Sequence, residues 1–398
     1  MTSAQAVAQA FVDQLVGQSS FPGAAVWAGD RNGTIAHAAA GKLSPSSGKD
    51  VTTETPFWIA SCTKLVTVIA LLQLVEQGKV DLDSPADKYV PGITKLQVIE
   101  ADGSLRPPKR QPTVRELASH TSGQTYPFFN EAVDAYCAKN GIDAFGCAKS
   151  SIEAPMIADP GTRWEYGSSI DWCGQIVEAV SGQDLDGYFK EHIFKPLGIK
   201  GMTFKPQTGG LLAPKSGTTY RDPADGSIHE IPHPLQQDES KIEVQYGGAG
   251  LYASAGEYGQ ILVALLNRGT HPKGGQILKP ETVELLFEEQ LSAELVKDLD
   301  RPVMATQPKV TNPFSILPGF EKQWCFGGCV ANNLPNGRGR GIWWAGIMNH
   351  YWFISLDRGT CGMVQVNQYP FFLEPVVVPF FFDFEPKIHN IVDPRKEE

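Results

Sequence analysis

The sequence predicts an α+β protein in which helices flank one antiparallel sheet, and this sheet is formed from both ends of the chain. Runs of strand-forming residues within 23–40 predict a hairpin, and three further runs within 341–369 predict an antiparallel meander. The region between them alternates helical patterns with proline and glycine turns. We therefore expect a sheet domain of residues 1–80 and 215–398, an inserted, mostly helical domain of residues 81–214, and an active site at their interface.

The N-terminal elements are predicted to be a helix followed by the hairpin. Val7, Phe11 and Leu15 lie four residues apart, which puts their side chains on one face of a helix. The two strands that follow, within residues 23–40, are separated by Asp30-Arg-Asn-Gly, a sequence typical of a tight turn. We expect this hairpin to join the strands from the C-terminal part of the chain in one sheet.

The strongest helical pattern of the chain covers residues 61–77. Its apolar side chains occupy almost every face, which is typical of a helix buried in the centre of a protein, and Gly78 follows as the expected C-cap. A proline-rich segment at residues 291–320 is expected to overhang the active site. Five further helices are predicted, at residues 114–119, 169–180, 185–194, 251–266 and 280–287.

Composition excludes several classes of protein. The 398 residues include 34 lysines and arginines against 44 aspartates and glutamates, and the net charge of −10 disfavours a nucleic-acid or membrane partner. The richest apolar run, residues 376–384, is shorter than a bilayer span and is interrupted by Pro379 and Asp383. The N-terminus lacks the pattern of a signal peptide, and seven cysteines are an odd number, so we expect reduced thiols and a cytoplasmic location.

A metal site or other cofactor is not expected. Cys325 and Cys329, or His229 and His233, could be imagined as metal-ligand pairs. Neither pair is accompanied by a second pair at the spacing of a zinc site, and both lie in loop sequence rich in glycine or proline.

Ser61 and Lys64 form the best candidate for a reactive pair. Residues three apart on a helix lie on the same face, and Ser61 is expected at the N-terminus, where free N–H groups favour negative charge. A lysine withdrawn from water can act as the base that a hydroxyl needs for attack on a carbonyl. By itself the spacing has another interpretation, because serine is also a common helix N-cap.

Further motifs follow this pair in a fixed order. Tyr166-Gly-Ser168 precedes a predicted helix, and Trp344-Ala-Gly346 ends a predicted strand. His120-Thr-Ser-Gly lies between Ser61 and Tyr166, and Gly247-Gly-Ala-Gly lies between Ser168 and Trp344. With Ser61-Cys-Thr-Lys, these motifs resemble the serine β-lactamase-like, penicillin-binding family, and within it the class C-like esterase branch, of the family VIII esterase type. The resemblance implies the β-lactamase/transpeptidase-like fold.

The resemblance assigns roles to individual residues. It implies that Ser61 attacks the carbonyl and that Lys64 and Tyr166 share the proton transfers, with the pKa of the tyrosine lowered by the nearby ammonium. The oxyanion would be held by the backbone N–H groups of Ser61 and Ile347. Ser168 would orient Lys64 or the substrate. The substrate would also contact Tyr126, Trp344, Ala345 and Gly346.

Other groups near these motifs have more modest interpretations. Asp171 is expected to support the start of the helix at residues 169–180. His120 invites a serine–histidine–aspartate triad, but the family gives this histidine no role as a base, and the chain has no Gly-x-Ser-x-Gly motif. We therefore do not expect a triad.

The positions at which the sequence differs from the β-lactamase pattern indicate which substrates the site would accept. Trp344-Ala-Gly346 replaces the usual Lys-Thr-Gly, which removes a cation that would bind a carboxylate and favours neutral, apolar acyl groups. Three stretches, at residues 166–172, 202–205 and 349–352, further resemble the fungal acyltransferases of the lovastatin pathway. The resemblance implies an esterase or acyltransferase of fungal-type secondary metabolism that acts on esters or thioesters of small or medium acyl groups, the donor being free or bound to a carrier protein.

Two alternatives stay open at this point. One is a β-lactamase or amide hydrolase of the same fold, and the other is a catalytically silent binding protein. The sequence leaves open the oligomeric state, the identity of the acyl group and acceptor, and the choice between hydrolysis and transfer.

Overall fold

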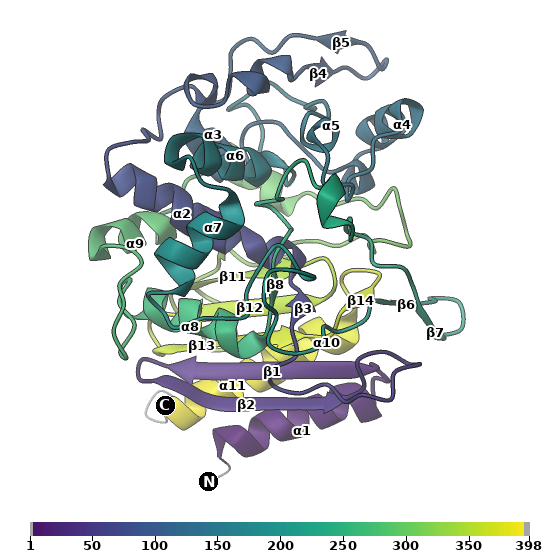
Figure 1. Ribbon diagram of the computed structural model, residues 1–398, viewed down its shortest axis with the longest axis vertical. Coiled ribbons are helices and arrows are strands. Elements are labelled where there is room, and N and C mark those ends of the chain that lie inside the picture. Colours follow the sequence, from purple (N-terminus) through teal and green to yellow (C-terminus); the bar gives the residue numbers. More distant parts are fainter. Residues whose placement is uncertain (1–2, 394–398) are drawn as a thin grey trace.

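The computed structural model describes residues 3–393, and its core is a seven-stranded antiparallel sheet (Figure 1). The N-terminal hairpin pairs with the C-terminal meander, as expected, since Val26 pairs with both Ala38 and Val364. The order across the sheet is β2 (Gly33–Gly41), β1 (Gly23–Asp30), β13 (Thr360–Gln365), β12 (His350–Ser355), β11 (Gly341–Gly346), β10 (Cys329–Val330) and β9 (Gln323–Trp324).

Helices cover both faces of this sheet. Successive side chains of a strand point to opposite faces of the sheet, so the side chains of Trp352 and Phe353 in β12 lie on opposite faces. Trp352 packs against Tyr258 of α8 (Ala255–Leu266), whereas Phe353 packs against Phe380. Every residue of β11, β12 and β13 is therefore buried, which explains why these strands are aromatic and β-branched without a polar alternation.

The second face is covered by both ends of the chain. Here α1 (Ala4–Gly17) packs on β1 and β2, as the spacing of its apolar residues predicts. The C-terminal run forms α10 (Glu374–Pro379), a π-helical segment, Phe380–Phe384, and α11 (Glu385–Val392). The sequence gives no specific signal for these helices. The π-helical segment and α11 lie beside α1, with Phe384 5.0 Å from Phe11 between ring centroids.

A buried ion pair joins α11 to the loop that precedes β11. Arg338 and Glu385 are both fully buried, and two nitrogens of the guanidinium donate to the two carboxylate oxygens at 2.6 Å. His389 lies 3.2 Å from the same carboxylate through Nε2, and its Nδ1 lies 2.7 Å from the Thr360 hydroxyl of β13. The buried polar groups of this cluster thus provide hydrogen-bond partners for one another.

Helix α2 (Thr63–Glu76) runs through the centre of the molecule, as the all-round apolar pattern predicts. It begins directly after a 3₁₀ turn, Ala60–Cys62, and ends before Gly78, whose φ of 68° is typical of a residue that ends a helix. The remaining helices are α3 (Val114–Ala118), α4 (Glu131–Asn140), α5 (Lys149–Ile152), α6 (Ser169–Ser181), α7 (Leu185–Phe189) and α9 (Pro280–Phe287).

The predicted start of the helix at residue 251 is wrong. Tyr252–Ala253 form a short strand, β8, that pairs with β3 (Phe57–Trp58), and α8 begins only at Ala255. The reason is local, because the Ser254 hydroxyl accepts a hydrogen bond from the N–H of Glu257 and so caps the helix. This strand pair holds the segment that leads into Ser61.

Two small sheets were also not expected. One is a hairpin of β4 (Val98–Ile99) and β5 (Leu105–Arg106). The other contains β14 (Gln368–Tyr369), β6 (Thr219–Arg221) and β7 (Ile228–Glu230). Strands of two or three residues are too short to give an alternation of polar and apolar residues. The division of the chain near residues 80 and 215 remains a proposal.

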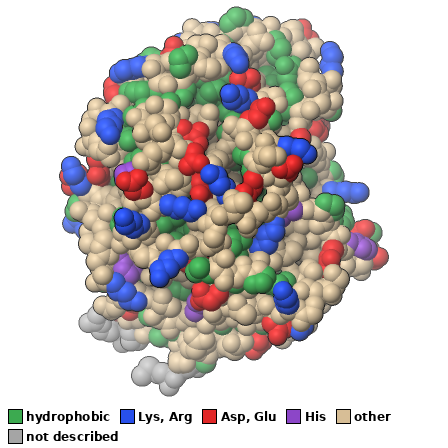
Figure 2. Space-filling model, in the orientation of Figure 1, with side chains coloured by type: hydrophobic (Ala, Val, Ile, Leu, Met, Phe, Trp, Pro, Cys, Tyr) green, Lys and Arg blue, Asp and Glu red, His purple; other side chains and the backbone are tan. Residues whose placement is uncertain are grey.

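Charged side chains of both signs are mixed on the surface. Figure 2 shows acidic and basic side chains interspersed over the visible face rather than gathered in a single charged region. Within residues 3–393, no helix is both long enough and apolar enough to span a membrane.

Glu385→Ala is expected to lower the free energy of unfolding by about 3–5 kcal/mol, because the Arg338 guanidinium is left buried without its carboxylate. Urea unfolding followed by circular dichroism measures the change. The control is Asp50→Ala, which breaks an exposed pair with Lys42 and is expected to change stability little. An equally small effect for both variants would contradict the structural role assigned to the buried pair.

Candidate active site

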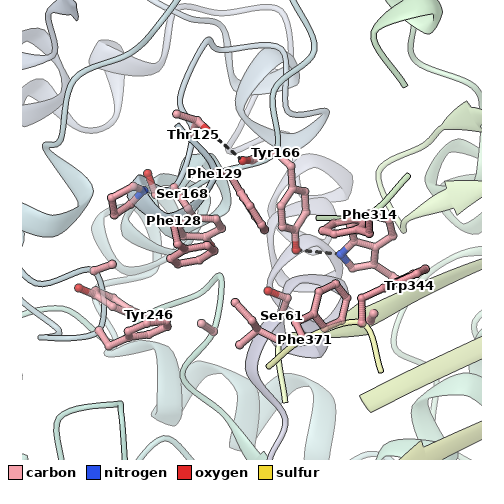
Figure 3. Close-up of a pocket in the computed structure, with 18 of the residues that line it drawn as sticks. Ser61, Thr125, Phe128, Phe129, Tyr166, Ser168, Tyr246, Phe314, Trp344 and Phe371 are labelled. Atoms are coloured by element: carbon pink, nitrogen blue, oxygen red, sulfur yellow. Dashed lines mark hydrogen bonds between the residues drawn. The ribbon is translucent and has the colours of Figure 1, made fainter. Parts of the chain in front are cut away.

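Ser61 lies in the 3₁₀ turn that precedes α2, with its side chain facing a cavity (Figure 3). The chain before it is held on both sides, because the Trp58 indole donates to the carbonyl of Ala249 at 2.6 Å and His350 Nε2 lies 2.9 Å from the Trp58 carbonyl. Ala60 has a φ of 45°, a strained value for a residue with a side chain. The turn that presents Ser61 is thus fixed by tertiary contacts.

The amine of Lys64 lies next to the Ser61 hydroxyl. Its Nζ is 3.1 Å from Ser61 Oγ, 3.0 Å from the Tyr126 hydroxyl and 2.8 Å from the carbonyl oxygen of Gly248. Burial lowers the pKa of Lys64 from the ordinary value of a lysine, and the negative charge of Asp171 opposes this shift. The amine can therefore lose its proton far more readily than an exposed lysine.

The Tyr166 hydroxyl accepts a hydrogen bond from the indole N–H of Trp344 at 2.8 Å (Figure 3). Burial raises the pKa of Tyr166, and hydrogen bonds with Ser61 and Trp344 oppose the shift. This direction is opposite to the one expected from a nearby ammonium. The reason is geometric, because Lys64 Nζ lies over the ring of Tyr166, 4.7 Å from its centroid, and hydrogen-bonds to Tyr126 instead.

The end of β11 comes very close to the turn of Ser61. A Cβ atom at Gly346 would lie only 2.4 Å from the carbonyl oxygen of Ile59, so only glycine permits this approach. Ala345 and Ile347, on either side of Gly346, both line the cavity with Ser61. The two backbone segments expected to bind an oxyanion are thus neighbours, and their role in binding it remains a proposal.

Ser168 lines the cavity but has a different partner from Lys64. Its hydroxyl lies 3.3 Å from the side-chain amide nitrogen of Gln124, whereas Tyr126 provides the hydroxyl beside Lys64. Of the two residues, Tyr126 therefore contacts the lysine, and the contact of Ser168 with a substrate remains a proposal. Sequence spacing could not make this distinction, since Tyr126 comes from a loop far from Lys64 along the chain.

His120 packs behind Tyr166, with 4.6 Å between the ring centroids. Its Nδ1 lies 3.0 Å from the Ser169 hydroxyl and accepts a long bond from the N–H of Gly167. Burial holds the pKa of His120 well below its usual value, so the ring is neutral. This arrangement agrees with the expectation that His120 is not the base of a triad.

The cavity around Ser61 is lined chiefly by aromatic and other apolar side chains. Among its lining residues there is no lysine, arginine or histidine, and Asp171 is the acidic residue. Rings on the cavity wall that the sequence motifs did not identify include those of Tyr246, Phe314, Phe371 and Phe372.

The proline-rich segment does reach over this cavity. Phe314 comes from it and lies between Phe129 and Phe372, with ring centroids 6.0 Å and 5.3 Å away. Two backbone hydrogen bonds connect the segment to other residues around the cavity. The N–H of Thr306 donates to the carbonyl of Phe128, and the N–H of Asn312 donates to the carbonyl of Phe371. These aromatic residues become recognisable as one wall only after folding.

Asp171 is the residue whose surroundings differ most from the sequence expectation. It lies in the first turn of α6, but its side chain is buried and accepts a hydrogen bond from the N–H of Gly248 at 2.8 Å. Its charge acts on Lys64, and burial raises its own pKa. Nothing in its spacing from Tyr166 distinguishes this position from an ordinary acidic residue at a helix start.

Within residues 3–393, no group of three or more histidine, cysteine, aspartate or glutamate side chains could hold a metal ion. All seven cysteines are free and buried.

The fold and the grouping of these motifs are those of the β-lactamase/transpeptidase-like class. A family model described as Beta-lactamase matches residues 8–375, and the chain belongs to this family. The chain is 32% identical to monacolin J acid methylbutanoyltransferase from Aspergillus terreus, over 77% of this chain and 76% of that protein. It is 28% identical to lovastatin esterase from Penicillium rubens, over 77% and 78% of the two chains.

Solved structures agree with these sequence matches. A mutant of simvastatin synthase from Aspergillus terreus superposes with a TM-score of 0.82 at 28% identity, covering 99% of this chain and 96% of that one. The prediction of a β-lactamase-like fold is therefore confirmed, and so is the enzyme class, since the relatives are acyltransferases and an esterase. The predicted resemblance to the lovastatin-pathway enzymes is confirmed as well.

Gly346→Ala is expected to lower the turnover of an activated ester by about 10²-fold, the effect of losing one oxyanion donor, because the new methyl group pushes β11 away from Ile59. Steady-state kinetics with a nitrophenyl ester measures this loss. Gly48→Ala is the control, since its Cβ meets no atom within 4 Å. A Gly346→Ala enzyme with normal turnover would show that the close approach is not needed for activity.

Proposed function

We propose that this protein is a serine esterase or acyltransferase that forms an acyl-enzyme on Ser61. The observation that carries the proposal is the 3.1 Å contact between Ser61 Oγ and the Nζ of a buried lysine whose pKa is lowered. The neutral amine of Lys64 accepts the proton of the hydroxyl while Oγ bonds to the carbonyl carbon of an ester or thioester. The backbone N–H groups of Ser61 and Ile347 bind the resulting oxyanion.

Tyr166 acts on the leaving group in this mechanism. Burial keeps its hydroxyl protonated, and the indole of Trp344 donates to its oxygen, which leaves the phenolic proton free to point elsewhere. The hydroxyl donates this proton to the departing alkoxide or thiolate as the bond from the carbonyl carbon breaks. The Tyr166 oxygen then regains a proton from the ammonium of Lys64, which becomes neutral again. Water or an alcohol then attacks the acyl group on Ser61 by the reverse sequence.

The lining of the cavity favours a neutral, apolar acyl group of small or medium size. Its aromatic walls offer apolar surface and, among the lining residues, no cationic side chain for a carboxylate. Trp344, Ala345, Gly346, Tyr126 and Ser168 are proposed to contact the substrate. The names of the relatives, a methylbutanoyltransferase and a lovastatin esterase, support a short branched acyl group and a reaction of fungal-type secondary metabolism.

The proposal also covers the form of the acyl donor and the cellular location of the enzyme. A thioester could reach Ser61 as a small molecule or while attached to a carrier protein, because the chemistry at the carbonyl is the same in both cases. The seven free cysteines are compatible with the reducing cytoplasm expected from the sequence.

Brief exposure of the enzyme to short and medium nitrophenyl esters, an acyl thioester and a cephalosporin is expected to add one acyl group, seen by intact-protein mass spectrometry. Ser61→Ala is expected to show no adduct, because the nucleophilic oxygen is gone. Decay of the adduct with and without added alcohols separates hydrolysis from transfer. Efficient turnover of the cephalosporin alone would favour an amide hydrolase, and no adduct with any donor would favour a silent binding protein.

The rate of acylation is expected to rise with pH as Lys64 loses its proton, because an ammonium has no lone pair to accept the proton of Ser61. Burial lowers the pKa of Lys64, so the midpoint of this rise lies well below the ordinary lysine value of about 10.4. Rapid-mixing kinetics with a nitrophenyl ester across neutral and mildly alkaline pH measures the midpoint. A rate independent of pH in this range would contradict the role of Lys64 as base.

A further inference from the structure

A second charged side chain lies beside the reactive pair. Asp171 is 2% exposed and lies in the first turn of α6, a helix that packs against α2, which carries Lys64. One oxygen of its carboxylate accepts the N–H of Gly248 at 2.8 Å. The mechanism proposed above uses Ser61, Lys64 and Tyr166 and gives this buried carboxylate no task.

The residue between the two charges is Gly248. Its N–H is bound by Asp171, and its carbonyl oxygen is bound by the amine of Lys64 at 2.8 Å. A Cβ atom at Gly248 would lie 2.8 Å from one oxygen of Asp171, so a side chain here would displace the carboxylate. One residue therefore hydrogen-bonds to both ionisable groups and connects them.

The other titratable groups around the pair are neutral at ordinary pH. Facing Lys64 are Tyr126, Tyr166, His120 and Cys62, and burial raises the pKa of the phenols and the thiol and lowers that of the imidazole. Facing Asp171, in addition to Lys64, Tyr126 and Tyr166, are Tyr246, Cys147 and Cys173, whose pKa values burial also raises. With these groups neutral, the charge that acts on Lys64 is that of the Asp171 carboxylate.

We propose that Asp171 is a positioning residue that sets the charge state and the base strength of Lys64, acting through Gly248 and through its own negative charge. The proposal rests on the proposed function of Lys64 as the base. An ionised carboxylate close to the amine favours the ammonium form. Lys64 therefore keeps its proton to higher pH than burial alone would allow, and its neutral form is a stronger base towards Ser61.

The direct test is the titration of Lys64 itself, followed by NMR on protein with isotope-labelled lysine, with Lys64→Met to assign the signal. In Asp171→Asn the midpoint is expected to fall by about one pH unit or more, since the group that favours the ammonium is gone. Gly248→Ala is expected to move the midpoint in the same direction by a smaller amount, because its methyl group displaces the carboxylate.

The matched control is Asp186→Asn. Asp186 is also a buried carboxylate, 3% exposed, and it accepts hydrogen bonds from the Thr203 hydroxyl and the N–H of Phe204, outside the cavity. This variant tests for effects of losing any buried carboxylate, and it is expected to leave the titration of Lys64 unchanged.

The pH profile of acylation gives a second readout that a merely structural role would not move. In Asp171→Asn the rise of the rate is expected at lower pH, with a lower plateau because the base is weaker. An unchanged or raised midpoint for Lys64 in Asp171→Asn overturns the proposal, and if that variant does not fold, Gly248→Ala decides by the same criterion. The NMR titration stays informative even if the enzyme forms no acyl adduct, so failure of the proposed function is recognised separately.

Discussion

Lys64 is withdrawn from water inside an aromatic site, and most of the architecture around it follows from this burial. An amine removed from water must find hydrogen-bond partners, and Lys64 finds them in Ser61, Tyr126 and the carbonyl of Gly248. These partners come from three distant parts of the chain. The dry surroundings that make the amine a usable base therefore exist only when α2, the loop at Tyr126 and the loop before α8 are packed together.

The sheet supplies the other fixed side of the site. Its edge reaches Ser61 through the end of β11, where Gly346 lies directly against the carbonyl of Ile59. The position of β11 depends in turn on its neighbours, since β13 joins the meander to the N-terminal hairpin. The two chain ends must therefore meet before the strand edge and the serine turn can face each other, and the buried pair of Arg338 and Glu385 helps to hold that closure.

Aromatic side chains do more than line the cavity, because several also control the polar groups. Trp344 packs on Tyr166 and donates to its hydroxyl, and His120 packs against the same tyrosine ring at a tilt. The indole that replaces the cation of the β-lactamases thus has two effects at once. It removes the charge that would attract a carboxylate, and it fixes the phenol that is proposed to donate to the leaving group.

The sequence by itself determined the fold class, the hairpin, the central helix, the C-terminal meander and the order of the three motifs. These features depend on local periodicity or on short motifs, both of which are present in the chain before it folds. Only the tertiary structure decided that Tyr126 rather than Ser168 contacts Lys64, that Asp171 faces the lysine, and that Phe314 and Phe371 share one wall. Such contacts join residues far apart in sequence, and hydrogen-bond geometry and burial, which set the pKa values, arise only when those residues meet.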